Sequence, residues 1–173
     1  LLTRLLIDRL VEKTDHYNLS PDDCYMIAMA SAFHDIGKIG IDEKILNKPG
    51  KLTKEEFEEI KKHTLIGANM LDKMERYREE PLIKVACRWH HERYDGKGYP
   101  DGLKGEDIPI AAQVVSLADV YDALTSKRAY KDAFSHEKAM NMILNGECGT
   151  FNPLLLEALI DIQDKVQEAL HLE

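Results

Sequence analysis

The stretch from residue 90 to residue 100, His-His-Glu-Arg-Tyr-Asp-Gly-Lys-Gly-Tyr-Pro, joins metal-binding side chains to a tight turn. Two adjacent imidazoles open it, and on a helix they point about 100° apart, which suits two metal ions or two sides of one ion. Glycine and proline then force a non-helical loop directly after them. We call this loop the lip and define it by Asp95, Gly96, Gly98, Tyr99 and Pro100. The pattern predicts an exposed loop beside a metal site.

Ionisable residues elsewhere in the chain stand in or beside apolar helical segments. His34 and Asp35 end a run rich in Ala, Met, Ile and Phe, and Asp119 lies in the run Ala-Asp-Val-Tyr-Asp-Ala-Leu. A buried carboxylate is costly unless it is paired or bound to a metal, so these groups are expected to converge. A single His such as His63 is more often structural than a ligand, and it gains weight only from this combination.

The donor types indicate which metals would fit. Imidazole nitrogen with carboxylate oxygen suits iron, manganese or zinc better than calcium or magnesium alone. The six groups exceed the needs of one ion, so two ions bridged by a shared carboxylate is the better interpretation. Cys87, three residues before His90, is a further candidate ligand, although a free Cys is more often a small core residue. Lys38 follows His34 by about one helical turn and can reach the same site, with a solvated lysine as the alternative.

Capping signals mark the helices that would carry these groups. Ser20 before Pro21 predicts a helix that is buried on most sides and delivers residues 34 and 35 near its end. Thr53 with Glu56 forms a capping box and predicts one helix that includes residue 63 and continues to residue 71. Pro81 begins a short helix that ends at residues 90 and 91.

The remaining segments are also helical or loop-like. We expect helices over 1–13, from 108 through 119, from Ser135 to 145, and from 153 to 170, with loops at 42–50 and 76–80. No stretch alternates over five residues or more. The sequence therefore predicts an all-α fold, a compact bundle of about six to seven helices.

Length and composition limit the function classes. The 173 residues suit one domain, 1–173, and the net charge of −8 argues against binding to a nucleic acid polymer. A small phosphorylated substrate is still compatible, because bound metal ions would reverse the local sign. Three scattered Cys suit a reducing cytoplasm, and no apolar run is long enough to cross a membrane. The chain begins inside an apolar-periodic segment, so we expect a C-terminal fragment of a longer regulatory protein with its first helix truncated.

Three motifs together resemble one family. Residues 34–38, His-Asp-Ile-Gly-Lys, are similar to the signature of the HD phosphohydrolase superfamily, and residues 90–100 match the HHExxDGxGYP pattern of its HD-GYP branch. The run 119–125, followed by Arg128 and Tyr130-Lys131, also resembles that branch. The resemblance covers residues 34 to about 153, most of the chain.

The resemblance implies an HD-type helical bundle and a metal-dependent phosphodiesterase. Its expected substrate is the bacterial messenger cyclic di-GMP, cleaved to linear pGpG, to GMP or to both through a metal-bound hydroxide. The implied cofactors are two divalent transition metals, with iron or manganese preferred over zinc, nickel or magnesium. The implied metal ligands are His34, Asp35, His63, His90, His91 and Asp119. Asp35 would bridge the ions and act in catalysis with Lys38, and Lys38, Arg128 and Lys131 would meet substrate phosphate and guanine.

One feature departs from the family pattern. Family members carry a further metal-contacting His on the helix ahead of the HD helix, whereas the first His here is His16, in a polar break. We therefore expect the position served by His34, Asp35 and Asp119 to bind metal weakly or to stay empty. The position served by Asp35, His63, His90 and His91 has four protein ligands and should fill normally.

Two other functions compete with the phosphodiesterase. One is a catalytically impaired module that responds to cyclic di-GMP and docks partner proteins through the Gly-Tyr-Pro lip. The other is an HD enzyme that acts on a different nucleotide. The expected partners also include an upstream sensor or receiver domain and a second copy in a homodimer, all in the cytoplasm and without membrane contact by this domain.

Overall fold

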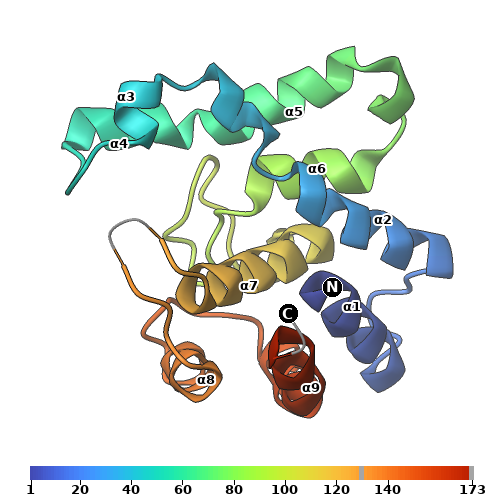
Figure 1. Ribbon diagram of the computed structural model, residues 1–173. Helices are drawn as coiled ribbons and strands as arrows, with labels where there is room; N and C mark the ends of the chain where they lie inside the picture. The colour runs from blue at the N-terminus through green and yellow to red at the C-terminus, as the bar shows by residue number, and fades with distance from the viewer. Residues whose placement is uncertain (129–130, 172–173) are drawn as a thin grey trace.

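The computed structural model describes residues 1–128 and 131–171, with side chains up to residue 169. Tyr130 and the side chain of Leu170, expected on the core side of the last helix, lie outside the described residues. The described chain is all-α, with a single bridge between Arg128 and Lys131 and no strand (Figure 1). The helices are α1 (Leu2–Lys13), α2 (Pro21–Phe33), α3 (Glu43–Leu46), α4 (Lys54–Lys61), α5 (His63–Lys73), α6 (Pro81–Trp89), α7 (Ile110–Thr125), α8 (His136–Leu144) and α9 (Pro153–His171). Short 3₁₀ turns are η1 (Ile36–Gly40), η2 (Glu75–Tyr77) and η3 (Gly105–Asp107).

The predicted helix starts are confirmed in atomic detail. The Ser20 hydroxyl accepts from the backbone of Asp23 at 3.1 Å, and the Asp23 carboxylate accepts from the backbone of Ser20 at 2.9 Å. Thr53 and Glu56 make the same reciprocal pair at the start of α4. Each pair satisfies backbone N–H groups that a helix start otherwise leaves without partners.

Two helix predictions need correction. The single helix expected from residue 54 to 71 is broken at Lys62 into α4 and α5. His63 Nδ1 donates to the carbonyl of Ile60, and the Thr64 hydroxyl donates to the carbonyl of Lys61, so side chains take acceptors that a continuous helix would use. The loop expected at 42–50 also contains the short helix α3. These two features raise the number of segments above the six or seven predicted.

A central helix organises the core. Residues 111–118 of α7 are all buried, and α1, α2, α6 and α8 pack around this helix, as Figure 1 shows. The larger core cluster joins α1, α2, α7, α8 and α9, and a smaller one joins α2, α5, α6 and α7. The helix α2 lies between the two clusters and buries Cys24, Ile27 and Ala30, whereas Ala32 is exposed. This helix is therefore buried on one face, whereas the sequence predicted burial on most sides. No described helix is both long enough and apolar enough to cross a bilayer.

A close backbone approach holds the end of α2 against α5. The turn η1 packs along α5, and a Cβ on Gly37 would stand 1.8 Å from the carbonyl oxygen of His63. No side chain larger than hydrogen fits there. The contact fixes Asp35 beside the first residue of α5, which is His63.

Candidate metal centre

Helix ends deliver most of the predicted ligands to one place. His34 follows α2, Asp35 precedes η1, His63 begins α5, and His90 and His91 follow α6, while Asp119 lies within α7. Their donor atoms form two groups, each with donors within 4.8 Å of one another. We call Asp35, His63, His90 and His91 the four-donor cluster, and His34, Asp35 and Asp119 the three-donor cluster. Asp35 belongs to both.

Three of the imidazoles are held by the same kind of bond. Nδ1 of His34 lies 2.6 Å from the carbonyl oxygen of Ser31, and Nδ1 of His63 lies 2.6 Å from that of Ile60. Nδ1 of His90 lies 3.0 Å from the carbonyl oxygens of two residues of α6. A carbonyl oxygen can only accept, so each Nδ1 carries a proton, and a lone pair for a metal ion can come only from Nε2. This backbone bond is typical of His that ligates metal.

In the four-donor cluster these lone pairs face one another. Nε2 of His63 lies 3.4 Å from Nε2 of His90, and each lies 3.4 Å from Oδ1 of Asp35. Among buried side-chain polar atoms of the described residues, Asp35 Oδ1 is the one without a hydrogen-bond partner. Lone pairs and an orphaned carboxylate oxygen repel one another unless a cation lies among them. The donors therefore fit a divalent metal ion.

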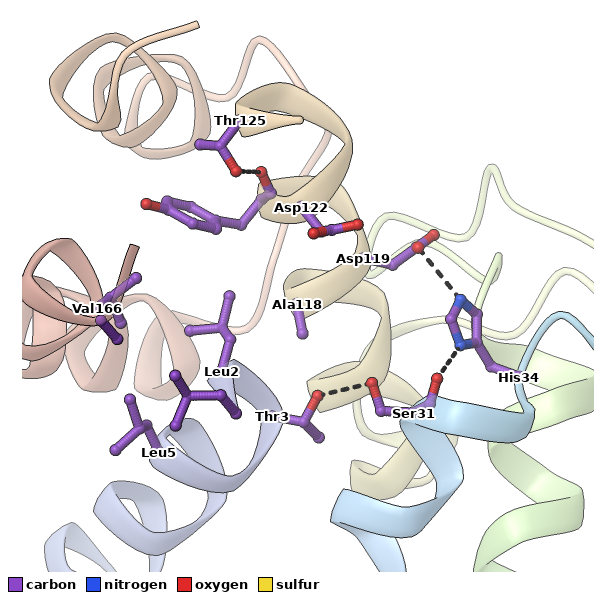
Figure 2. Close-up of a pocket in the computed structure, with 13 residues that line it drawn as sticks. Leu2, Thr3, Leu5, Ser31, His34, Ala118, Asp119, Asp122, Thr125 and Val166 are labelled. Carbon is purple, nitrogen blue, oxygen red and sulfur yellow. Dashed lines mark hydrogen bonds and ion pairs between the residues drawn. The ribbon is translucent and has the colours of Figure 1, made fainter. Parts of the chain in front are cut away.

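The three-donor cluster places an imidazole between two carboxylates. Nε2 of His34 lies 3.2 Å from Oδ2 of Asp35 and 3.2 Å from Oδ1 of Asp119, the second of which Figure 2 shows. Burial opposes protonation of His34, but the two carboxylates outweigh it and raise its pKa to about 10. Burial by itself would raise the pKa of Asp119, but the hydrogen bond with His34 outweighs burial, so the pKa of Asp119 is lowered. This position already attracts positive charge.

The shared carboxylate also meets a lysine. Burial alone would raise the pKa of Asp35, but the His34 imidazole and its neighbours hold it far below its ordinary value. Nζ of Lys38 lies 3.1 Å from Oδ2 of Asp35, and the Lys38 side chain is 45% exposed. Lys38 thus reaches the edge of the centre from η1 with one side open to solvent.

Glu92 holds the chain segment that follows the lip. The buried Glu92 carboxylate accepts backbone N–H bonds from Asp101 at 2.6 Å, Gly102 at 3.1 Å and Leu103 at 2.9 Å. Glu92 is part of the motif at residues 90–100, but the sequence alone indicated no role for it. The available signal was a carboxylate beside two His and ahead of a glycine-rich loop, where backbone N–H groups lack helical partners.

Tyr99 corrects the prediction of an exposed lip. Its ring is half-buried and stacks on the ring of His91 with centroids 4.8 Å apart and planes 17° apart. Burial raises the pKa of its hydroxyl to about 12. Tyr99 thus contacts the candidate metal ligand His91, whereas the lip residue Asp95 accepts a hydrogen bond from the backbone of Lys97.

Other sequence candidates lie outside the two clusters. Cys87 points its sulfur at the carbonyls of Phe33 and His34, and burial raises its pKa to about 12, so it is a core residue here. His16 packs edge-on against Tyr17. Nζ of Lys131 lies over the ring of Phe134 and 3.5 Å from the carbonyl of Ala123, and Arg128 is exposed. The structure brings neither Arg128 nor Lys131 into contact with the clusters.

A cavity of about 380 Å³ opens beside the three-donor cluster (Figure 2). Leu2, Leu5 and Val166 line its α1 and α9 side, and His34 and Asp119 line the other. Ser31, Asp122 and Thr125 are among its further polar lining residues. The cavity offers room for part of a substrate next to a cation position.

Comparison with known proteins identifies the family. A family model described as HD domain matches residues 5–151. A "Probable cyclic di-GMP phosphodiesterase" of Vibrio cholerae is 45% identical over 91% of this chain and 37% of its own length. A "3'3'-cGAMP-specific phosphodiesterase 2" of the same species is 39% identical over 86% of this chain and 28% of its own length.

A solved structure shares the fold. An HDG"Y"P protein from Bdellovibrio bacteriovorus superposes with a TM-score of 0.68 at 22% identity, over 94% of this chain and 50% of that one. The chain spans about a third of the length of the curated relatives named above. Matched across most of its length by the family model and by relatives at this identity, the chain belongs to the HD domain family, and the motif at residues 90–100 assigns it to the HD-GYP branch.

Proposed function

We propose that this chain is a metal-dependent phosphodiesterase that hydrolyses cyclic di-GMP to linear pGpG, GMP or both. The observation that carries the proposal is the pair of donor clusters that share Asp35. Two cations that share a ligand are a recurring arrangement for cleavage of phosphate esters. The printed name of the Vibrio relative at 45% identity supports the substrate.

The residues have separate roles in this proposal. The four-donor cluster and the three-donor cluster would each hold one divalent transition metal, and we prefer iron or manganese for the mixed imidazole and carboxylate donors. Bound ions would supply Lewis acidity, which lowers the pKa of a water to about 7 and offsets charge on phosphate oxygens. Asp35 would organise both positions.

Lys38 would stabilise developing negative charge. Its ammonium lies 3.1 Å from Asp35 and remains partly exposed toward the open side of the centre. A fixed cation there is placed for a phosphate oxygen that gains charge during the reaction. Arg128 and Lys131 would meet phosphate or guanine at a greater distance, after movement of their side chains.

A binding module without turnover is the weaker alternative. A module that only binds nucleotide has no need for two converging sets of metal donors that share a carboxylate. The second relative favours a different candidate substrate, 3'3'-cGAMP, because its name carries that specificity at 39% identity. The cytoplasmic location, the upstream sensor or receiver domain, the homodimer and partner docking at the lip stay predictions.

The test is a product assay with both cyclic dinucleotides. The chain is loaded anaerobically with Fe²⁺, or with Mn²⁺, and incubated with cyclic di-GMP or 3'3'-cGAMP, and products are separated by chromatography. We expect pGpG or GMP from cyclic di-GMP, and none from an Asp35→Asn variant, which keeps the side-chain shape but not the charge. Binding without product would support the module, and faster cleavage of 3'3'-cGAMP would reassign the substrate.

A further inference from the structure

His91 differs from the other imidazoles of the centre in how its ring is held. His34, His63 and His90 each donate from Nδ1 to a backbone carbonyl. In the part of the chain that the structure describes, no hydrogen bond reaches the ring of His91, although the residue is in the four-donor cluster. A metal-ligating His normally has such a bond, which fixes the direction of the ring. Something else must orient this one.

Aromatic rings surround His91 instead. The Tyr99 ring lies nearly parallel to it at 4.8 Å, and the His63 ring meets it edge-on at 5.1 Å. The His90 ring, from the preceding residue, is tilted by 46° at 4.3 Å. His63 and His90 are themselves candidate ligands with bonds of their own. Of these three neighbouring rings, Tyr99 is the one that is not itself a candidate metal ligand, so its contact can orient the His91 ring.

The backbone of the lip is built to bring Tyr99 to this position. A Cβ on Gly98 would stand 2.4 Å from the carbonyl oxygen of His91 and 2.4 Å from the backbone nitrogen of Arg93, so only glycine allows the return. The backbone N–H of Tyr99 then donates to the carbonyl of His91 at 3.3 Å. Glu92 fixes the chain that follows, through its three bonds to residues 101–103.

The helix α4 backs Tyr99 from outside. The Phe57 ring meets Tyr99 edge-on at 6.1 Å, and Nζ of Lys61 lies 5.4 Å from the Tyr99 centroid and 4.9 Å from that of Phe57. Phe57 itself is 43% exposed, so it packs on Tyr99 with only part of its surface. These contacts limit movement of Tyr99 away from His91.

We propose that Tyr99 is a positioning residue for His91, whose ring it aligns by stacking so that the free nitrogen points into the four-donor cluster, with Phe57 as its support from α4. The inference rests on the proposed metal site. The hydroxyl of Tyr99 has no part in it, because stacking needs only the ring.

The test measures the Mn²⁺ affinity of the four-donor cluster. Binding is detected as a loss of the electron paramagnetic resonance signal of free Mn²⁺. All chains carry Asp119→Asn, which weakens the three-donor cluster and leaves the other to be measured by itself. We expect Tyr99→Phe to bind like the parent and Tyr99→Leu to raise the Kd by roughly 10- to 100-fold. Tyr94→Leu is the matched control, since Tyr94 lies on the same loop and contacts Glu106 rather than a His. It should leave the Kd unchanged.

A double-mutant cycle separates positioning from general damage to the loop. In a His91→Ala background, Tyr99→Leu should change the Kd by no more than about twofold, because its effect passes through His91. An equal loss in that background, a parent-like Kd for Tyr99→Leu, or a loss in Tyr99→Phe would each overturn the proposal. If Tyr99→Leu does not fold, the Phe57→Leu variant tests the proposal in its place. A smaller rise in Kd that disappears in the His91→Ala background supports the proposal, and an unchanged Kd overturns it. A parent that binds no Mn²⁺ would overturn the proposed metal site itself.

Discussion

At the scale of single residues, the centre is defined by which nitrogen atoms hold protons. Backbone carbonyls keep a proton on Nδ1 of His34, His63 and His90, so Nε2 is the atom that points inward in each ring. Burial and the neighbouring His90 and His63 lower the pKa of His91 to about 3, so the His91 ring is neutral at ordinary pH. His34, in contrast, is protonated in the metal-free chain.

This difference predicts a pH dependence of metal binding. The pKa of His34 is raised from 6.5 to about 10, so a metal at the three-donor cluster must displace a proton below that value. Affinity of that cluster should rise about tenfold per pH unit through the neutral range. Mn²⁺ titrations at roughly pH 6, 7 and 8 would check this, with His34→Gln as the variant that removes the proton. A flat profile in the parent would contradict the assignment.

The raised pKa of His34 has the opposite effect on the stability of the metal-free fold. The pKa of His34 is higher in the folded chain than the ordinary value of 6.5. The ion pairs of the protonated ring with Asp35 and Asp119 therefore stabilise fully below pH 6.5 and are lost as pH rises through about 10. Metal affinity and metal-free stability at this position thus change in opposite directions.

Lys38 supplies a second prediction at this scale. Lys38→Ala removes a cation that lies beside Asp35 without removing a donor from either cluster. We expect metal content to stay unchanged and kcat to fall by roughly 10²- to 10³-fold, the usual effect of losing one charge-stabilising group. Elemental analysis and steady-state kinetics on the same sample would measure both. Loss of metal together with rate would show that Lys38 helps to hold Asp35 in place.

At the scale of elements, close packing of η1 on α5 sets the distance between Asp35 and His63. Gly37→Ala would put a methyl group 1.8 Å from the His63 carbonyl oxygen, so the two segments must separate. We expect a loss of about 3 kcal/mol in unfolding free energy, seen as a Tm lower by roughly 6–12 °C. Metal affinity should fall as well, since Asp35 would move away from His63.

Gly40 provides the matched control in the same turn. A Cβ there would meet the flexible side chain of Ile66 at 3.0 Å, and not backbone. Gly40→Ala should therefore cost less stability and leave metal affinity close to the parent. Equal effects of the two substitutions would mean that glycine content, and not the close approach at Gly37, matters in η1.

At the scale of the whole molecule, the metal centre joins helices of the smaller core cluster to a helix that both clusters share. His63 begins α5 and His90 follows α6, which pack in the smaller cluster, while Asp119 lies on α7, which contributes to both. Ions at the centre would connect these parts. A ligand that binds only the folded state stabilises it, by about 2.7 kcal/mol when present at 100 times its Kd.

The two clusters should fill unequally. One has four protein donors and the other three, and both need Asp35. A Mn²⁺ titration of this chain should give one tight and one weak class of site, and the tight class should raise Tm by roughly 5–10 °C. Asp119→Asn should remove the weak class alone. Two equally tight classes in the parent would show that the three-donor cluster needs no further ligand.

The amino-acid sequence was enough to predict the residue types of the centre and most helix starts. Caps at Ser20 and Thr53 are local, because each satisfies N–H groups within three residues, and the HD and HHExxDGxGYP motifs are readable as spacing. The family resemblance already implied a division of the ligands around Asp35, but the contacts that bring residues 35, 63, 90 and 119 together from four segments are a property of the tertiary structure. Only the tertiary structure decided that Tyr99 turns inward to His91. That outcome depends on bonds to Glu92 and on the close return at Gly98, which are contacts across the loop that no periodic pattern records.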